Sequence, residues 1–213
     1  MFMGLVGSEM CIRDSSVIVT GASNTFSSGV DLASMVGDGG ANYEEPFETC
    51  IDALINFKKP LIAAVDGTAI GGGATILLHF DAVFISPNAK VKYPFSDLGL
   101  APEVGSSLLL FQSLGYQKAA QLLFGAEWIS GQEYFNFGMA KYLGDDYYDK
   151  AIDYAHQLNE QSLASIMETK TILKSFNADA LSAARDLETK AMKRLYGSED
   201  NIKAIEKFFS RKG

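Results

Sequence analysis

Two glycine-containing turns in the sequence could each present a backbone N–H group to a ligand. The first lies in the stretch FSSGVDL, at Gly29-Val30, and the second in the triplet Gly71-Gly72-Gly73. Each turn precedes an expected helix, where the first N–H groups have no acceptor within the helix. Two such donors that converge on one point form an oxyanion hole, which stabilises developing negative charge. Taken singly, however, each could be no more than a tight turn.

The segment VIVTGAS at residues 17–23 also resembles the start of a dinucleotide-binding dehydrogenase. That fingerprint needs closely spaced glycines after the first strand, whereas Gly21 is followed by no glycine until Gly29. A short-chain dehydrogenase also needs a lysine four residues after a catalytic tyrosine, and no tyrosine of this chain has one. The dinucleotide interpretation therefore fails twice.

Composition excludes several classes of function. A chain of 213 residues that is 47% apolar can bury one substantial core. Its net charge of −8 and the lack of a basic cluster argue against a nucleic-acid partner. Two cysteines without metal spacing and two isolated histidines predict no metal site. We also expect no transmembrane helix and no membrane partner, because the apolar runs are short.

The order of elements predicts an α/β fold. Strands are expected at 16–20, 61–65 and 82–86, with a loop at 22–42 and helices at 43–57 and 74–80. From Glu103 onward the chain is expected to be mainly helical, at 103–114, 116–124, 130–137, 149–175, 179–196 and 199–211. We therefore expect a layered core over 16–140 and a helical region over 141–213. Residues 1–15 have neither helical nor strand periodicity and resemble translated adapter sequence, so we expect a non-native leader and a core that lacks its N-terminal part.

Both glycine turns and the segments around them resemble the crotonase superfamily, the enoyl-CoA hydratases and isomerases. The likeness rests on FSSGVDL and on AAVDGTAIGGGATILLHFDAVFIS, and it extends from about Ser16 to the C-terminus. It implies a spiral of ββα turns with a helical C-terminal region that forms a homotrimer or a hexamer. It also implies binding of an acyl-CoA thioester, with coenzyme A as part of the substrate and no separate cofactor.

The resemblance also implies site residues. The two oxyanion donors fall on the N–H groups of Val30 and Gly72. Contacts with the substrate fall on Ser28, Asp31, Leu32, Phe95, Leu98, Phe208 and Lys212. For Lys212, a solvated basic helix end is an equally good explanation.

The expected reaction follows from the carboxylates. The two positions that carry carboxylates in the superfamily's hydratases are Thr75 and Phe95 here, so hydration by that mechanism is not expected. The segment YPFSDLGLAPEVGSS is similar to the peroxisomal-type Δ3,Δ2-enoyl-CoA isomerases, whose single catalytic glutamate falls on Glu103. One carboxylate suits an isomerase, because the base that removes a proton can return it. Pro102-Glu103 could also be an ordinary helix start.

Two alternatives stay open: an acyl-CoA-binding module without turnover, and another crotonase-fold enzyme such as a hydratase. A cytoplasmic location is the default expectation, or a peroxisomal or mitochondrial one in a eukaryote.

Overall fold

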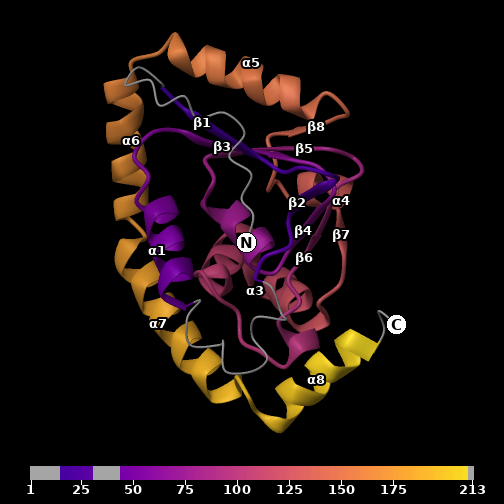
Figure 1. Ribbon diagram of the computed structural model, residues 1–213. Coiled ribbons are helices and arrows are strands. Elements are labelled where there is room, and N and C mark those ends of the chain that lie inside the picture. Colours follow the sequence, from indigo (N-terminus) through magenta and orange to yellow (C-terminus); the bar gives the residue numbers. More distant parts are fainter. Residues whose placement is uncertain (1–14, 31–43, 211–213) are drawn as a thin grey trace.

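The computed structural model describes residues 15–30 and 44–210, and it forms a spiral in which successive turns add one strand to each of two sheets (Figure 1). The first sheet has the order β1-β3-β5-β8, and all of its strand pairs are parallel. The second has the order β2-β4-β6-β7, with only β6 and β7 antiparallel. This is the spiral of ββα turns that the sequence resemblance implies.

Three strand pairs build this spiral. The first sheet receives β1 (Val17–Thr20), β3 (Leu61–Val65) and β5 (Ala82–Ile85), while the second receives β2 (Thr25–Ser27), β4 (Thr68–Ile70) and β6 (Lys90–Lys92). The strands β3 and β5 are buried along their whole length because elements cover both faces of the sheet, as is typical of parallel strands. Two short strands complete the sheets: β7 (Ile129–Ser130) and β8 (Tyr142–Leu143).

Helices close the core on several sides. The early ones are α1 (Glu44–Ile55), α2 (Gly72–Thr75), and the 3₁₀ turns η3 (Ile76–His79) and η4 (Ser96–Leu98). The later ones are α3 (Ser106–Gly125), α4 (Gly131–Asn136), α5 (Tyr147–Asn159), α6 (Leu163–Ser175), α7 (Ala178–Leu195) and α8 (Glu199–Ser210). Helix α5 lies over the first sheet, and α6 and α7 run down one edge of the molecule beside α1 (Figure 1).

The structure corrects two of the expected helices. The segment expected as one helix over 149–175 is two, because Ser162 accepts a hydrogen bond from the N–H of Ser165 and caps a new helix there. The helix expected from Glu103 begins only at Ser106, because Val104 and Gly105 adopt left-handed backbone conformations, with φ of 61° and 75°. Glu103 is therefore outside the helix, and the ordinary helix start considered for Pro102-Glu103 is wrong.

Among the described residues, no helix is long and apolar enough to cross a membrane.

Candidate functional site

The two glycine turns lie against each other. Gly29 has a φ of 72°, and a carbon added at its Cβ position would lie 2.7 Å from the carbonyl oxygen of Ile70 and 2.9 Å from the nitrogen of Gly72. Only glycine fits here, since a side chain would be strained and would clash with main chain. Val30 follows this glycine directly and is half-buried. The structure therefore brings the turn that carries Val30 into contact with the start of α2.

The N–H groups at the start of α2 are only partly used. Ala74 and Thr75 both donate to the carbonyl of Gly71, at 2.9 Å. Within the described part of the chain, the N–H of Gly72 has no protein acceptor. A helix start leaves such donors available for an anionic ligand.

Glu103 reaches the same place from another part of the chain. A carbon at the Cβ position of Gly72 would lie 3.4 Å from Oε1 of Glu103, 3.5 Å from Cε2 of Phe47 and 3.7 Å from Cα of Gly29. A carboxyl group, an aromatic ring and two glycine turns thus surround one small space.

The environment of Glu103 favours its protonated form. Burial raises its pKa from 4.5 to about 7, and the negative charges of Glu188 and Glu48 add to that effect. A carboxyl group with a pKa near neutrality can both accept and return a proton, which general acid–base catalysis requires.

Thr75 cannot replace a second carboxylate. It is fully buried, and its hydroxyl group donates to the carbonyl of Gly72 at 3.1 Å. Phe95, the other position that carries a carboxylate in hydratases, is 4% exposed and belongs to the hydrophobic core. Glu103 is therefore the acid that the described residues place beside Gly72.

The remaining predicted contacts are spread more widely. Ser28 is exposed next to Gly29, and Leu98 is half-buried in η4, where its carbonyl accepts a hydrogen bond from Asn201 of α8 at 2.7 Å. Phe208 is half-buried on α8, with its ring edge-on to Phe209. The predicted residues Asp31, Leu32 and Lys212 lie outside the described residues.

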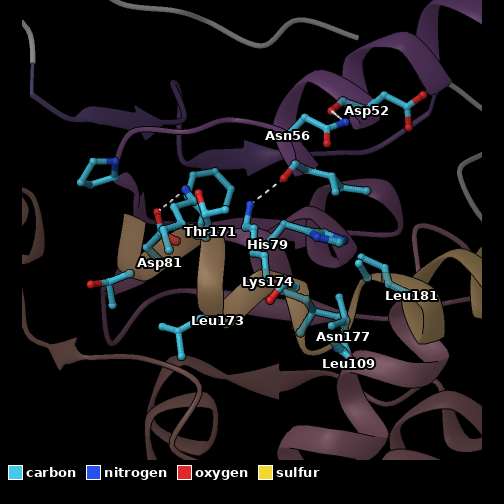
Figure 2. A pocket seen from close by; sticks show the side chains of 18 of the residues that line it. Asp52, Asn56, His79, Asp81, Leu109, Thr171, Leu173, Lys174, Asn177 and Leu181 are labelled. Carbon is cyan, nitrogen blue, oxygen red and sulfur yellow. Dashed lines mark hydrogen bonds and ion pairs between the residues drawn. The ribbon is translucent and has the colours of Figure 1, made fainter. Parts of the chain in front are cut away.

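A cavity of about 1090 Å³ lies beside this site, between α1, η3, α6 and α7 (Figure 2). Glu48 and His79 belong to its lining, whereas Gly72 and Glu103 do not. Lys174 extends from α6 and donates to the carbonyl of Ile55 at 2.6 Å. The cavity and the space at Gly72 are therefore separate features.

Two residues near Glu103 were not identified from the sequence. Phe47 falls within the helix expected at 43–57 and Glu188 within the helix expected at 179–196, but the sequence predicts no role at the site for either residue. Glu188 is 6% exposed although it carries a charge. The available signal was its place in the apolar stripe of α7, which includes Leu181 and Ala184 at helical spacing.

Known proteins are similar to this chain along most of its length. A family model described as "Enoyl-CoA hydratase/isomerase" matches residues 11–213. The rat protein "Enoyl-CoA delta isomerase 2" is 30% identical over 92% of this chain, and the chain spans 52% of that relative's length. The Escherichia coli protein "2,3-dehydroadipyl-CoA hydratase" is 28% identical over 96% of this chain and 82% of its own length.

A solved structure gives the same result. The structure of Pseudomonas aeruginosa OdaA superposes with a TM-score of 0.84 at 34% identity, covering 91% of this chain and 80% of the other. With the matched family model, these similarities show that the chain belongs to the enoyl-CoA hydratase/isomerase family, the crotonase superfamily.

Proposed function

We propose that this chain converts a 3-enoyl-CoA to the conjugated 2-enoyl-CoA, with Glu103 as its single acid–base group. The observation that carries the proposal is the position of Oε1 of Glu103, 3.4 Å from the Cβ position of Gly72. The absence of a carboxylate at Thr75 and Phe95 supports isomerisation over hydration, which would need an activated water.

In this reaction the Glu103 carboxylate removes a proton from C2 of the acyl chain. The electron pair of that C–H bond delocalises onto the thioester oxygen and forms a dienolate. The N–H groups of Val30 and Gly72 donate to this oxygen and stabilise the charge more than they stabilise the neutral substrate. The Glu103 carboxyl then returns the proton at C4, and the double bond moves from C3–C4 to C2–C3. The scheme needs no further cofactor.

Substitution of the base tests this proposal. The purified protein is given a 3-enoyl-CoA, and the absorbance of the conjugated thioester is followed. We expect Glu103→Gln to lower kcat by about 10²–10⁴-fold, the usual contribution of a general acid–base group, with acyl-CoA binding retained. Glu168→Gln, which removes an exposed carboxylate on α6, is the matched control and should leave turnover unchanged.

The pH profile gives a second test of the same base. Because the pKa of Glu103 is about 7, the fraction of ionised base falls below neutral pH. We expect kcat/KM to decrease as the pH falls through 7, with a slope of one proton. A profile that stays flat down to pH 5 would exclude Glu103 as the base.

Because one relative is named as a hydratase, hydration is the second candidate reaction. A hydratase would form a 3-hydroxyacyl-CoA from a 2-enoyl-CoA and water, and chromatography separates this product from the isomer. Acyl-CoA binding without either product would instead identify a non-catalytic binding module.

A further inference from the structure

Glu188 is a buried carboxylate that contacts the start of α3 from another helix. Its Oε2 accepts a hydrogen bond from the N–H of Gly105 at 2.7 Å, and its Oε1 accepts one from the N–H of Ser107 at 2.9 Å. The hydroxyl group of Ser107 also donates to Oε1. Because Gly105 has no side chain to cap α3, Glu188 of α7 satisfies the N–H groups at that end of the helix.

The capped turn carries Glu103. Between Glu103 and α3, Val104 and Gly105 have φ angles of 61° and 75°. A left-handed conformation is unfavourable at a β-branched residue such as Val104 and persists only where the surroundings enforce it. Glu188 provides one such constraint at Gly105, and His79 provides another, because its Nε2–H donates to the carbonyl of Val104 at 2.8 Å.

We propose that Glu188 is a positioning residue for proton transfer: by capping α3 it holds the turn that carries Glu103 against Gly72. The negative charge of Glu188 is also one of the causes that raise the pKa of Glu103. The inference rests on the proposed function, since it assigns Glu188 a part in the chemistry of Glu103. It reaches the substrate only through Glu103.

Glu188 differs in its ion pairing from the other charged groups around this turn. Among the described residues, the charged or titratable groups near the turn come from α1, η3, α6 and α7, and they are Glu48, Asp52, His79, Lys174, Arg185 and Glu188.

Several of these groups are ion-paired or neutral. Arg185 binds Glu48 at 2.6 Å and Asp52 at 2.8 Å, so its one positive charge is shared by two carboxylates. Burial lowers the pKa of His79 to about 4, so its ring is neutral at physiological pH. Glu188, in contrast, forms no ion pair with any of the described residues. Of the two carboxylates that raise the pKa of Glu103, Glu188 is therefore the one that forms no ion pair with the described residues.

Three variants on α7 test the proposal. Glu188→Gln keeps the side-chain size but removes the charge and one acceptor, and Glu188→Asp keeps the charge on a shorter side chain. Asp186→Asn is the matched control, because it removes an exposed carboxylate from the same helix. Circular dichroism establishes that each variant is folded before its kinetics are compared.

For Glu188→Gln we expect kcat to fall by about 10–100-fold with KM nearly unchanged, because small displacements of a reacting group reduce its rate steeply. We also expect the acid limb of the pH profile to move down by roughly 0.5–1 pH unit, since a like charge has been removed. Glu188→Asp should keep the wild-type midpoint. Loss of stability alone would leave that midpoint in place, so a Glu188→Gln profile identical to that of Asp186→Asn overturns the proposal.

A titration that needs no turnover separates this inference from the proposed function. Protein labelled with ¹³C at the glutamate carboxyl carbons is titrated by NMR, and the Glu103 signal is the one lost in Glu103→Gln. A lower midpoint in Glu188→Gln supports the coupling even if the wild-type protein lacks isomerase activity, and an unchanged midpoint overturns it.

If Glu188→Gln does not fold, Ser107→Ala replaces it in both measurements, because it removes one donor to Glu188 and keeps the charge. We then expect a several-fold loss of kcat with the wild-type midpoint retained. An unchanged kcat overturns the positioning role.

Discussion

At the scale of single residues, the ionised Glu103 carboxylate lowers the stability of the folded chain but suits the proposed proton transfer. Burial and two other glutamates raise the pKa of Glu103 to about 7, so its ionised form is less stable in the folded chain than in water. Folding therefore opposes ionisation of Glu103, and the same property suits it for returning a proton. Active-site groups commonly lower the stability of their proteins in this way.

This cost predicts a pH-dependent effect of Glu103→Gln on stability. The pKa of Glu103 is about 7 in the folded chain and has an ordinary value of 4.5 when unfolded. Between these two pKa values the folded state binds more protons than the unfolded state. The contribution of Glu103 to the stability of the folded chain is therefore present at pH 4.5 and is lost as the pH rises through 7. Glutamine does not titrate. We expect the variant to gain stability relative to wild type, by on the order of 1 kcal/mol, at pH 8 compared with pH 5.

Urea unfolding at the two pH values measures this difference, and Glu168→Gln corrects for the loss of an ordinary exposed carboxylate. The same stability difference for Glu103→Gln at both pH values would show that the pKa of Glu103 is not raised.

The residues of the site differed in how well the sequence predicted them. Glu103, Val30 and Gly72 were assigned by resemblance, and the structure brings Glu103 and the turn before Val30 to Gly72; their catalytic roles stay predictions. Glu188 was missed because its hydrogen bonds join residues about 80 positions apart in the chain. Such a contact has no local spacing from which it could be inferred.

At the scale of elements, adjacent glycines in the α2 turn meet different surroundings. A carbon at the Cβ position of Gly73 would lie 2.3 Å from the carbonyl oxygen of Ser27, which is a severe clash with β2. The corresponding position at Gly72 has no neighbour closer than 3.4 Å, and that neighbour is Oε1 of Glu103. Gly73 is thus required for packing against β2, whereas the space at Gly72 is not filled by packing and is the space that we propose the substrate enters.

Two alanine variants separate these requirements. We expect Gly73→Ala to lower the melting temperature strongly, because main chain must move to admit the methyl group. Gly72→Ala should stay folded with nearly the wild-type melting temperature but should lose at least about 10-fold in kcat/KM, since its methyl group enters the space between the turns. Calorimetry and the isomerase assay together distinguish the two effects. Full activity in Gly72→Ala would mean that the substrate does not use this space.

Long or strongly patterned elements were predictable, and short ones were not. The sequence placed β3 and β5 almost correctly, because each is an unbroken apolar run between turn residues. It missed the short strands, which depend on pairing with their neighbours. These are β2, β4 and β6, with three residues each, and β7 and β8, with two each; β2 lies in the segment expected as a loop. The late start of α3 was also missed, since a left-handed valine depends on contacts from η3 and α7 rather than on local preference.

At the scale of the whole molecule, α6 and α7 leave large apolar side chains in contact with solvent. Phe176, between the two helices, is 82% exposed, and Leu187 on α7 is 67% exposed. Ile172 and Leu173 on α6 are also exposed. Where such side chains form one patch, they usually mark a protein–protein contact. The homotrimer or hexamer that the sequence resemblance implies makes further copies of this chain the expected partners.

We therefore expect that Phe176→Glu weakens self-association. A charge placed in an apolar contact must lose its hydration without a partner, which is strongly unfavourable. Size-exclusion chromatography with light scattering should give a trimer or hexamer for the wild-type chain and a smaller species for the variant. Gln157→Glu adds the same charge at an exposed position of α5 and should leave the assembly unchanged. A monomeric wild-type chain, or a variant that assembles as well as Gln157→Glu does, would show that α6 and α7 do not form the subunit contact.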